Sequence, residues 1–263
     1  KQDLLTALQA YEEAHGDLRK VIDINHTKEY ENLHLTKQGE HTRAYIKVQD
    51  GCNQFCSYCI IPYARGRVRS RAKEDVVAEV TDLAKNGYQE VVLTGIHLSS
   101  YGIDFENEDN LLSLIRAVHE IEGIKRIRLG SLEPRIITEE FVQAIAALPK
   151  MCPHFHLSLQ SGCNETLKRM NRRYTSEEFY EKCEILRKYF EKPALTTDVI
   201  VGFPQETEEE FETTYEFLKK ICFYETHIFK YSRRHGTKAA AMSGQLTEAQ
   251  KAVRSDKMLA LNE

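Results

Sequence analysis

Short apolar runs alternate with longer amphipathic segments through most of the chain. The apolar runs have the length of β-strands and cover residues 44–48, 90–94, 126–130, 155–160, 197–201 and 226–231. Between them, apolar residues recur every three or four positions, which predicts helices at residues 73–86, 111–121, 138–148, 176–189 and 208–220. Thr138 and Thr175 each precede acidic residues at a helix start and are expected to cap it.

Strand and helix alternate through six strands, which predicts a parallel α/β fold. Right-handed crossovers would curl the sheet into a barrel or partial barrel, while a doubly wound open sheet is the alternative that the pattern leaves open. In both folds the C-terminal ends of the strands meet at one edge, where active sites form. Polar residues and glycines follow every predicted strand, at positions 51–71, 94–97, 131–134, 160–162, 202–204 and 231–233. We therefore expect one site built from many loops.

The composition is that of a globular chain with a sizeable core, since 41% of the 263 residues are hydrophobic and 29% are charged. No apolar run approaches the roughly 18 residues of a membrane span, and the start does not read as a signal peptide. The seven cysteines are expected to lie in a reducing compartment, the cytoplasm, with no membrane partner.

Charge is unevenly distributed along the chain, although the net charge is only −4. Basic residues form three runs: Arg65, Arg67, Arg69, Arg71 and Lys73; Lys168, Arg169, Arg172 and Arg173; and Lys230, Arg233, Arg234 and Lys238. Acidic residues concentrate at positions 104–109 and 206–212. This segregation indicates an anionic partner, and a solvated face is the alternative for any single run.

Three cysteines follow the first predicted strand in the segment GCNQFCSYCIIPYARGRVRSR, residues 51–71. Cys52, Cys56 and Cys59 are spaced C-x3-C-x2-C, so one loop could wrap three thiolates around one inorganic core. A structural zinc site wants a fourth ligand, and a zinc loop or three unrelated thiols are the alternatives. Three thiolates on a four-iron cluster would leave one iron open to a small molecule. The remaining thiols are dispersed and are expected to be buried or incidental: Cys152, Cys163, Cys183 and Cys222.

This spacing resembles the signature of the radical S-adenosylmethionine (SAM) superfamily. Tyr58 matches the aromatic residue that the superfamily places before the third cysteine, and VIVGFP at 199–204, with Glu206, matches its glycine motif after the fifth strand. The resemblance implies a 4Fe–4S cluster on the three cysteines. The open iron would bind SAM through its amino and carboxylate groups, and one electron would cleave SAM to a 5′-deoxyadenosyl radical.

Five stretches resemble the methylthiotransferases within that superfamily, and the resemblance extends over nearly the whole chain. They are GCNQFCSYCIIPYARGRVRSR, LTGIHLSSYG, HLSLQSGCNETLKRMNRRYT, DVIVGFPQETEEEF and KYSRRHGTKAAAM. IIPYARG together with LTGIH is most similar to the MtaB type, which inserts sulfur into N6-threonylcarbamoyladenosine next to the tRNA anticodon and methylates it. The resemblance implies a partial (β/α)6 TIM-like barrel, the tRNA anticodon arm as partner, and an electron donor such as a flavodoxin or ferredoxin.

The same resemblance implies a domain organisation. Residues 1–40 are expected to be a helical lead-in and remnant of an N-terminal methylthiotransferase domain, and residues 41–245 the radical SAM partial barrel. Residues 246–263 are expected to form a C-terminal helix leading to an absent RNA-binding domain. A second 4Fe–4S cluster is expected only in the full-length family, so we expect this chain to be the SAM-cleaving core.

Five residues of the predicted edge are candidates for binding the cofactor. Thr94 and Gly95 resemble the loop that supports the methionyl amino group through backbone oxygens. Ser131, Glu133 and Gln160 are polar groups that could bind the ribose or the amino acid end of SAM. Each could instead be a structural group of the barrel edge.

Further candidates lie on the later loops. Gly202 and Phe203 are expected to pass near the adenine, Gly202 because a bare backbone allows close approach. Arg173 could pair with the methionyl carboxylate, since a guanidinium can donate two parallel hydrogen bonds to the two oxygens of a carboxylate. Asp198 is expected to be structural. The histidines are expected to be packed or hydrogen-bonded: His97, His154, His156 and His227.

Five arginines are candidates for contacts with tRNA phosphates: Arg65, Arg67, Arg69, Arg71 and Arg233. Two other functions stay open. The chain could be a non-catalytic tRNA-binding module with a structural cluster, or a radical SAM enzyme that modifies another tRNA nucleoside or a protein side chain.

Overall fold

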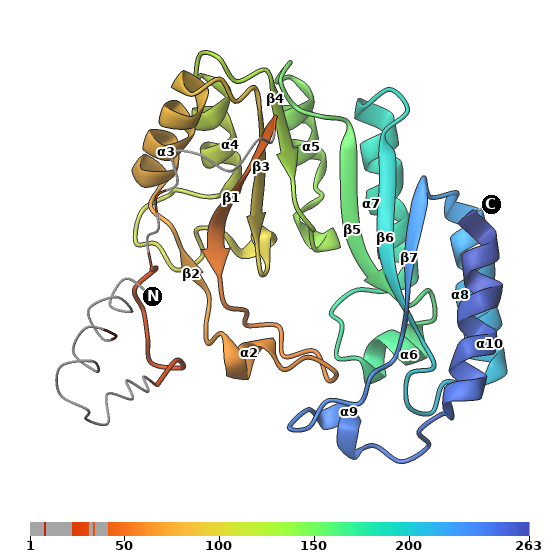
Figure 1. Ribbon diagram of the computed structural model, residues 1–263. Helices are drawn as coiled ribbons and strands as arrows, with labels where there is room; N and C mark the ends of the chain where they lie inside the picture. Colours follow the sequence, from red (N-terminus) through yellow and green to blue (C-terminus); the bar gives the residue numbers. More distant parts are fainter. Residues whose placement is uncertain (1–7, 9–22, 32–33, 35–41, 263) are drawn as a thin grey trace.

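A computed structural model describes residues 8, 23–31, 34 and 42–262 (Figure 1). Most of the predicted lead-in lies outside these residues. The predicted boundaries at residues 40 and 245 therefore stay predictions.

Six parallel strands form a curved wall, in the order β1, β3, β4, β5, β6, β7 (Figure 1). The strands are β1 (Arg43–Asp50), β3 (Glu90–Gly95), β4 (Arg126–Leu129), β5 (His154–Gln160), β6 (Ala194–Val201) and β7 (Glu225–Lys230). A short strand, β2 (Arg69–Ser70), pairs antiparallel with the end of β1. Between β4 and β5 the wall is held only by isolated bridges, Ile127 to Met151 and Leu132 to Leu157.

Helices cover the outer face of this wall (Figure 1). The longer ones are α3 (Lys73–Lys85), α4 (Leu111–His119), α5 (Glu139–Ala146), α7 (Ser176–Tyr189), α8 (Glu208–Ile221) and α10 (Glu248–Leu259). The shorter ones are α2 (Ile61–Ala64), α6 (Asn164–Arg169) and α9 (Lys238–Ala241), with 3-10 turns at Leu98–Ser100, Pro134–Ile136 and Ala260–Asn262. No helix in the described ranges is long and apolar enough to cross a bilayer.

Alternation along each strand decides which face is buried. In β1, Ala44, Ile46 and Val48 lie in the main core beneath the helices, whereas Arg43 and Lys47 lie on the opposite, inner face. The inner face is polar at the start of other strands too. The inner surface of the wall is thus free to present polar groups to a ligand.

The predicted α/β partial barrel is confirmed, and the doubly wound alternative is wrong because the helices pack on one face of a curled sheet. All six predicted strands and all five predicted helices are present, with ends displaced by a few residues. The two predicted caps are also present: Thr138 accepts from the Phe141 amide, and Thr175 forms a capping box with Glu178. The sequence pattern missed β2, α2, α6 and α9, which are too short to show periodicity.

Candidate active site

The cysteine loop starts where β1 ends, and its two ends are joined. Gly51 has a φ of +70°, and a Cβ there would lie 1.8 Å from the carbonyl oxygen of Arg67. The Cys52 amide donates to the carbonyl of Gly66 at 3.1 Å. Glycine is required at position 51 because the returning backbone occupies the space of a side chain.

Asp50 anchors this loop with its carboxylate. Arg65 donates to both carboxylate oxygens, at 3.0 and 2.7 Å, and Lys47 Nζ lies 2.5 Å away. The Gly51 amide donates to Asp50 Oδ1 at 2.8 Å. Burial alone would raise the pKa of Asp50, but the hydrogen bonds from Arg65 and Lys47 lower it to about 2. An ionised Asp50 therefore fixes the position of the loop.

The three cysteines of the loop are free thiols, with Cys52 buried and the other two partly buried. Burial raises the pKa of Cys52 and Cys59, and the neighbouring Cys56 adds to both shifts. Bound iron would reverse this preference, because a metal favours the thiolate. No three acidic, histidine or cysteine side chains among the described residues converge as for a single metal ion. A four-iron cluster does not need that arrangement, since each thiolate binds a different iron.

Arg172 lies behind the second cysteine. Its Nη1 is 3.4 Å from Cys56 Sγ, its Nε donates to the Tyr174 hydroxyl at 2.9 Å, and its Nη2 donates to the Ser158 carbonyl at 2.9 Å. The guanidinium also lies 4.9 Å from the Tyr174 ring centre. A permanent positive charge is thus held by three groups, one of which is the Cys56 thiol.

The sequence analysis selected Arg173, and the structure places it elsewhere. Arg173 is exposed in a groove that Lys168, Glu178 and part of Arg172 also line, and no contact joins its side chain to a cysteine among the described residues. The preceding Asn171 has a φ of +58° and donates to the Phe55 carbonyl at 2.9 Å, so the chain turns sharply and directs Arg172 inward. Nothing in the sequence distinguishes the two adjacent arginines.

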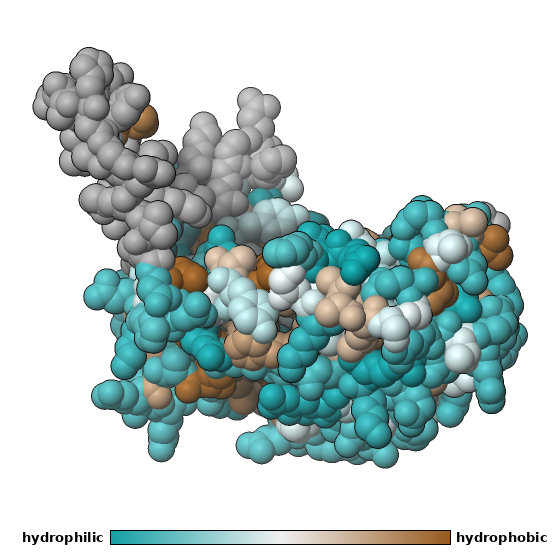
Figure 2. All heavy atoms as spheres, turned by 90° about the horizontal axis from the view of Figure 1, so that it is seen from below, coloured by the Kyte–Doolittle hydropathy of each residue, from teal (hydrophilic) through white to brown (hydrophobic). Residues whose placement is uncertain are grey.

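A cavity of about 470 Å³ opens between the cysteine loop and the ends of β5, β6 and β7. Its wall includes Tyr58 and Cys59 on one side, Gln160 and Asp198 from neighbouring strands, and Tyr231 and Arg234 across from them. Figure 2 shows this end of the molecule, where hydrophilic side chains dominate with a few apolar ones exposed among them. The cavity joins three of the predicted loops.

Two acceptor side chains come together on the wall of this cavity. Gln160 is 9% exposed and has a φ of +72°, a conformation that is costly for a non-glycine residue and is found at functional sites. Asp198 points to the inner face of β6, where His156 Nε2 lies 3.2 Å from its Oδ2. The expectation that Asp198 is purely structural missed the strand alternation, because Val199 and Val201 are buried and Asp198 is not.

An aromatic group backs the cavity. Phe203 is fully buried, with its ring centre 6.4 Å from that of Tyr58 and 5.5 Å from that of Tyr231. The Tyr231 hydroxyl is buried and has no hydrogen-bond partner among the described residues. It is therefore a polar group on the cavity wall that a ligand could satisfy.

Neither Gly202 nor Phe203 lines the cavity itself, and their expected place near the adenine stays a prediction. A Cβ on Gly202 would lie 2.2 Å from Lys251 Cγ, so its bare backbone allows the close approach of α10. Phe203 supports the wall from behind, and Ile200 lines the cavity in its place.

The β3 and β4 candidates lie on the other half of the edge. Thr94 and Gly95 end β3, and a Cβ on Gly95 would lie 2.8 Å from Gln49 Oε1. Ser131 is exposed, and Glu133 is 7% exposed and accepts from Arg135 Nε at 2.8 Å. None of these four lines the 470 Å³ cavity.

The sequence analysis missed Gln49, which ties the two strand ends together. It is fully buried, and its Nε2 donates to the Gly51 carbonyl at 2.8 Å. Its Oε1 accepts from the His97 amide at 2.7 Å. Burial, with Arg172 and Arg135 nearby, lowers the pKa of His97 to about 4, so this histidine is neutral.

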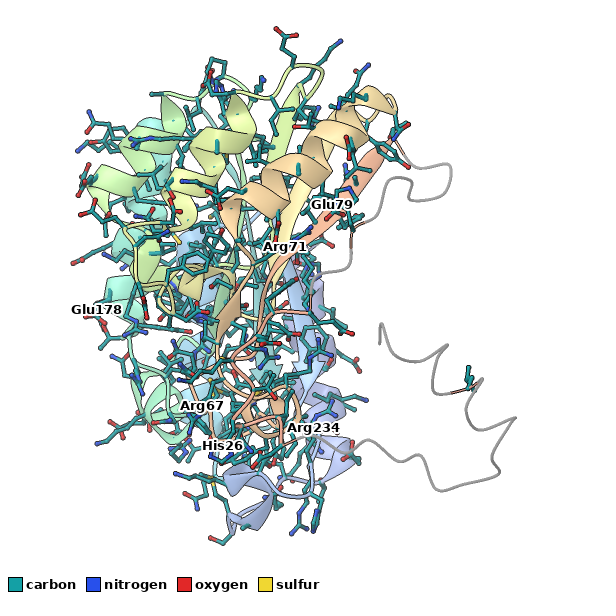
Figure 3. The ribbon with its side chains drawn as sticks, turned by 90° about the vertical axis from the view of Figure 1, so that its left-hand side faces the viewer. His26, Arg67, Arg71, Glu79, Glu178 and Arg234 are labelled. Atoms are coloured by element: carbon teal, nitrogen blue, oxygen red, sulfur yellow. The ribbon has the colours of Figure 1, made fainter. Side chains whose placement is uncertain are left out.

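Most of the first basic run is turned inward. Arg69 donates to the carbonyls of Arg65 and Arg67, and Arg71 forms a buried ion pair with Glu79 (Figure 3). The expectation that Arg69 and Arg71 hold RNA phosphates is therefore wrong, because paired, buried guanidiniums are not available to a phosphate. Arg65 is engaged with Asp50.

Exposed cations remain at the same end of the molecule. Arg67 is exposed over the Phe55 ring at 4.7 Å, and Figure 3 places it at the end that also carries Arg234. Arg233 is also exposed, with its Nε bonded to the Ala240 carbonyl at 2.8 Å. Within the described part of the chain, Arg67 and Arg233 form no ion pair with a carboxylate.

The Radical SAM superfamily model matches residues 46–218, which include the cysteine loop, the β5 and β6 side of the cavity and the turn after β6. The chain belongs to the radical SAM superfamily. The superfamily implies a 4Fe–4S cluster and SAM, and the three-thiol loop beside the cavity fits that pair of cofactors.

Two curated relatives are similar over nearly the whole chain. The threonylcarbamoyladenosine tRNA methylthiotransferase MtaB of Bacillus subtilis is 42% identical over 263 residues, all of this chain and 58% of the relative. The tRNA-2-methylthio-N(6)-dimethylallyladenosine synthase of Thermoanaerobacter pseudethanolicus is 42% identical over 242 residues, 92% of this chain and 51% of the relative. The chain thus spans little more than half the length of these relatives.

A solved structure shows the same fold. The radical S-adenosylmethionine methyltransferase TsrM from Kitasatospora setae matches with a TM-score of 0.63 at 20% identity, over 75% of this chain and 38% of TsrM. At this identity the match concerns the fold alone.

Proposed function

We propose that the chain is the SAM-binding core of a tRNA methylthiotransferase, which inserts sulfur into N6-threonylcarbamoyladenosine next to the anticodon and methylates it. The observation that carries the proposal is the free-thiol loop facing a polar cavity at the C-terminal ends of the strands. The whole-chain similarity to two tRNA-modifying relatives supports the substrate class.

Cys52, Cys56 and Cys59 would hold the cluster. With SAM bound, the cluster would supply the one-electron chemistry that opens an unreactive C–H bond. The protein contributes the position of the loop, set by Asp50 and Gly51, and a buried positive charge beside Cys56.

SAM would lie along the cavity. Gln160 and Asp198 are two neighbouring acceptors suited to the ribose hydroxyls, and Tyr58 and Ile200 offer apolar contact to the adenine. Arg172 takes the carboxylate role first expected for Arg173, since it is the arginine beside the cysteines.

The candidate residues at the ends of β3 and β4 would contact SAM from the other side of the site. Thr94 and Gly95 would offer backbone oxygens to the methionyl amino group. Ser131 and Glu133 would complete the polar edge on the far side of the site.

The RNA would approach from the same end. Arg67 and Arg233, together with the exposed Lys238, are suited to phosphate contacts, so binding should weaken steeply with salt. The sulfur source, a second 4Fe–4S cluster, would lie in the part of the longer relatives that this chain does not cover. A flavodoxin or ferredoxin would supply electrons in the cytoplasm.

Anaerobic reconstitution with iron and sulfide tests the core of the proposal. After addition of dithionite and SAM, we expect 5′-deoxyadenosine from the wild-type chain and only background from Cys56→Ala. Cys222→Ala is the matched control, since this exposed thiol lies at the end of α8, and it should retain full product and iron content. Equal product from Cys56→Ala and wild type would contradict the proposal.

A different tRNA nucleoside is the second candidate. The relative named for dimethylallyladenosine is as similar to this chain as the one named for threonylcarbamoyladenosine. Identity alone does not separate the two substrates.

A further inference from the structure

Two cations line one wall of the cavity without a carboxylate in ion-pair contact among the described residues, although the charge of Glu248, at the start of α10, acts on one of them, Lys230. Lys230, at the end of β7, and Arg234 both line it, and in the described part of the chain neither forms an ion pair with a carboxylate. The one acid on the cavity wall, Asp198, is already beside His156. The β7 side of the cavity therefore carries excess positive charge.

The segment that carries these cations is fixed at several points. The Tyr231 amide donates to the Val201 carbonyl at 2.9 Å, and Lys251 Nζ donates to the Tyr231 carbonyl at 3.0 Å. Thr237 Oγ1 donates to the Arg234 carbonyl at 2.8 Å. The Ala239 amide donates to the Ser57 carbonyl at 2.8 Å, which ties the segment to the cysteine loop. The backbone under both cations is thus pre-organised.

An exposed aromatic ring lies beside them. Phe229 lines the same cavity and is 53% exposed. Aromatic rings of this kind stack on unpaired bases in RNA recognition. A purine on Phe229 would lie in the cavity that Arg234 also lines, whereas Lys230 follows Phe229 in β7 and starts from the opposite face of the strand.

The two substrates named for the relatives differ in charge at the N6 substituent. A threonylcarbamoyl group carries a carboxylate, whereas a dimethylallyl group is a hydrocarbon. A carboxylate would pair with an unneutralised guanidinium or ammonium, whereas a hydrocarbon would leave both cations desolvated without a partner.

We propose that Lys230 and Arg234 form a subsite for the carboxylate of the N6 substituent and so select an anionic modified adenosine over an apolar one. This inference rests on the proposed tRNA function, which it narrows to one class of substrate. RNA phosphates could use the same chemistry, and the experiment has to separate the two sources.

The binding of three hairpin RNAs distinguishes recognition of the N6 carboxylate from recognition of RNA phosphates. The hairpins are identical except for one loop nucleoside: N6-threonylcarbamoyladenosine, its methyl ester, or N6-dimethylallyladenosine. Fluorescence anisotropy with the reconstituted chain, at one fixed salt concentration, gives each affinity. We expect the wild-type chain to bind the free acid roughly tenfold more tightly than the ester or the dimethylallyl hairpin.

Lys230→Gln and Arg234→Gln should each reduce that preference several-fold. They should have little effect on binding of the two hairpins whose N6 substituent is uncharged. Lys238→Gln is the matched control, because Lys238 is exposed on the same segment but lines a groove outside the cavity. Lys238→Gln should weaken the binding of all three hairpins by the same factor. The thermal midpoint of each variant checks that it is folded.

Three outcomes are decisive against the inference. Equal binding of acid and ester by the wild-type chain would overturn the subsite, and the tRNA function would stand. If Arg234→Gln weakens the binding of all three hairpins by the same factor, Arg234 contacts an RNA phosphate and has no part in the subsite. No binding of any hairpin would overturn the proposed RNA substrate and the inference with it.

Discussion

Arg172 is the residue whose replacement tests the geometry of the site most directly. Lysine keeps the charge but cannot reach Cys56, Tyr174 and the Ser158 carbonyl together, because it lacks the planar fork. We expect Arg172→Lys to weaken SAM binding by roughly tenfold or more. Arg173→Lys is the matched control and should bind SAM as the wild-type chain does. Equilibrium dialysis of SAM against the reconstituted chain measures both, and the reverse ranking would return the role to Arg173.

The same pair of arginines marks what the sequence could predict at this scale. The three cysteines are close in sequence, so their spacing alone predicts a common ligand. The burial of Arg172 depends on contacts with β5 and the cysteine loop, which are distant in sequence. Asp198 was predictable from strand alternation, whereas Gln49 was not, because only the fold brings it to His97.

At the level of elements, α10 holds the turn that follows β6. Glu206 Oε2 accepts from the Gly202 amide at 2.7 Å and from Arg254 Nη1 at 2.6 Å, and both of these charged side chains are almost fully buried. Breaking a buried pair leaves an unpaired charge. We expect Arg254→Ala to lower the free energy of unfolding by about 3 kcal/mol, measured in urea.

Lys257→Ala is the control for that change. Lys257 lies on the same helix and pairs with Glu212, but both side chains are about 40% exposed. Exposed pairs contribute little, so the loss should stay below about 1 kcal/mol. Equal losses from the two variants would mean that the buried pair does not anchor the helix.

The long elements were predictable and the short ones were not, for a physical reason. The six strands and five helices bury whole faces, so their apolar periodicity appears in the sequence. By contrast, α9 is a four-residue helix with two buried alanines, and it is held by Thr237 and by its contact with the cysteine loop. Such an element is specified by its neighbours in the fold, and the cavity wall that it supports could not be predicted from local pattern.

For the whole molecule, the half-barrel places opposite requirements on its two faces. The outer face is a continuous apolar core under the helices, while the inner face gathers charge. On that inner face Glu90 alone pairs with Arg43, Arg126 and Arg128, at 2.9, 3.0 and 3.1 Å. The sequence showed segregated charge but not which cations the fold would neutralise. Arg67, Arg233 and Arg234, for which the described residues supply no ion pair, lie at the C-terminal end of the barrel, where an anionic substrate is proposed.

Two groups in the network under the cysteine loop contribute to the acid stability of the whole molecule. The folded-state pKa of His97 is about 4, below its usual 6.5, so folding favours the neutral ring. This contribution is complete above pH 6.5 and is lost as the pH falls towards 4, a change of about 3 kcal/mol. Asp50 has a folded-state pKa of about 2, below its usual 3.8, and its contribution of about 2 kcal/mol is complete above pH 3.8 and lost as the pH falls towards 2.

We therefore expect the free energy of unfolding to decrease in two successive steps on acidification, first between about pH 6.5 and 4 and then between about pH 4 and 2. Urea unfolding at a series of pH values measures both steps. His97→Asn keeps a polar partner for Ser100, which lies 2.5 Å from the ring Nδ1, and should reduce only the upper step, to which His154 also contributes because burial lowers its pKa. An upper step of unchanged size in this variant would show that other groups control stability in that range.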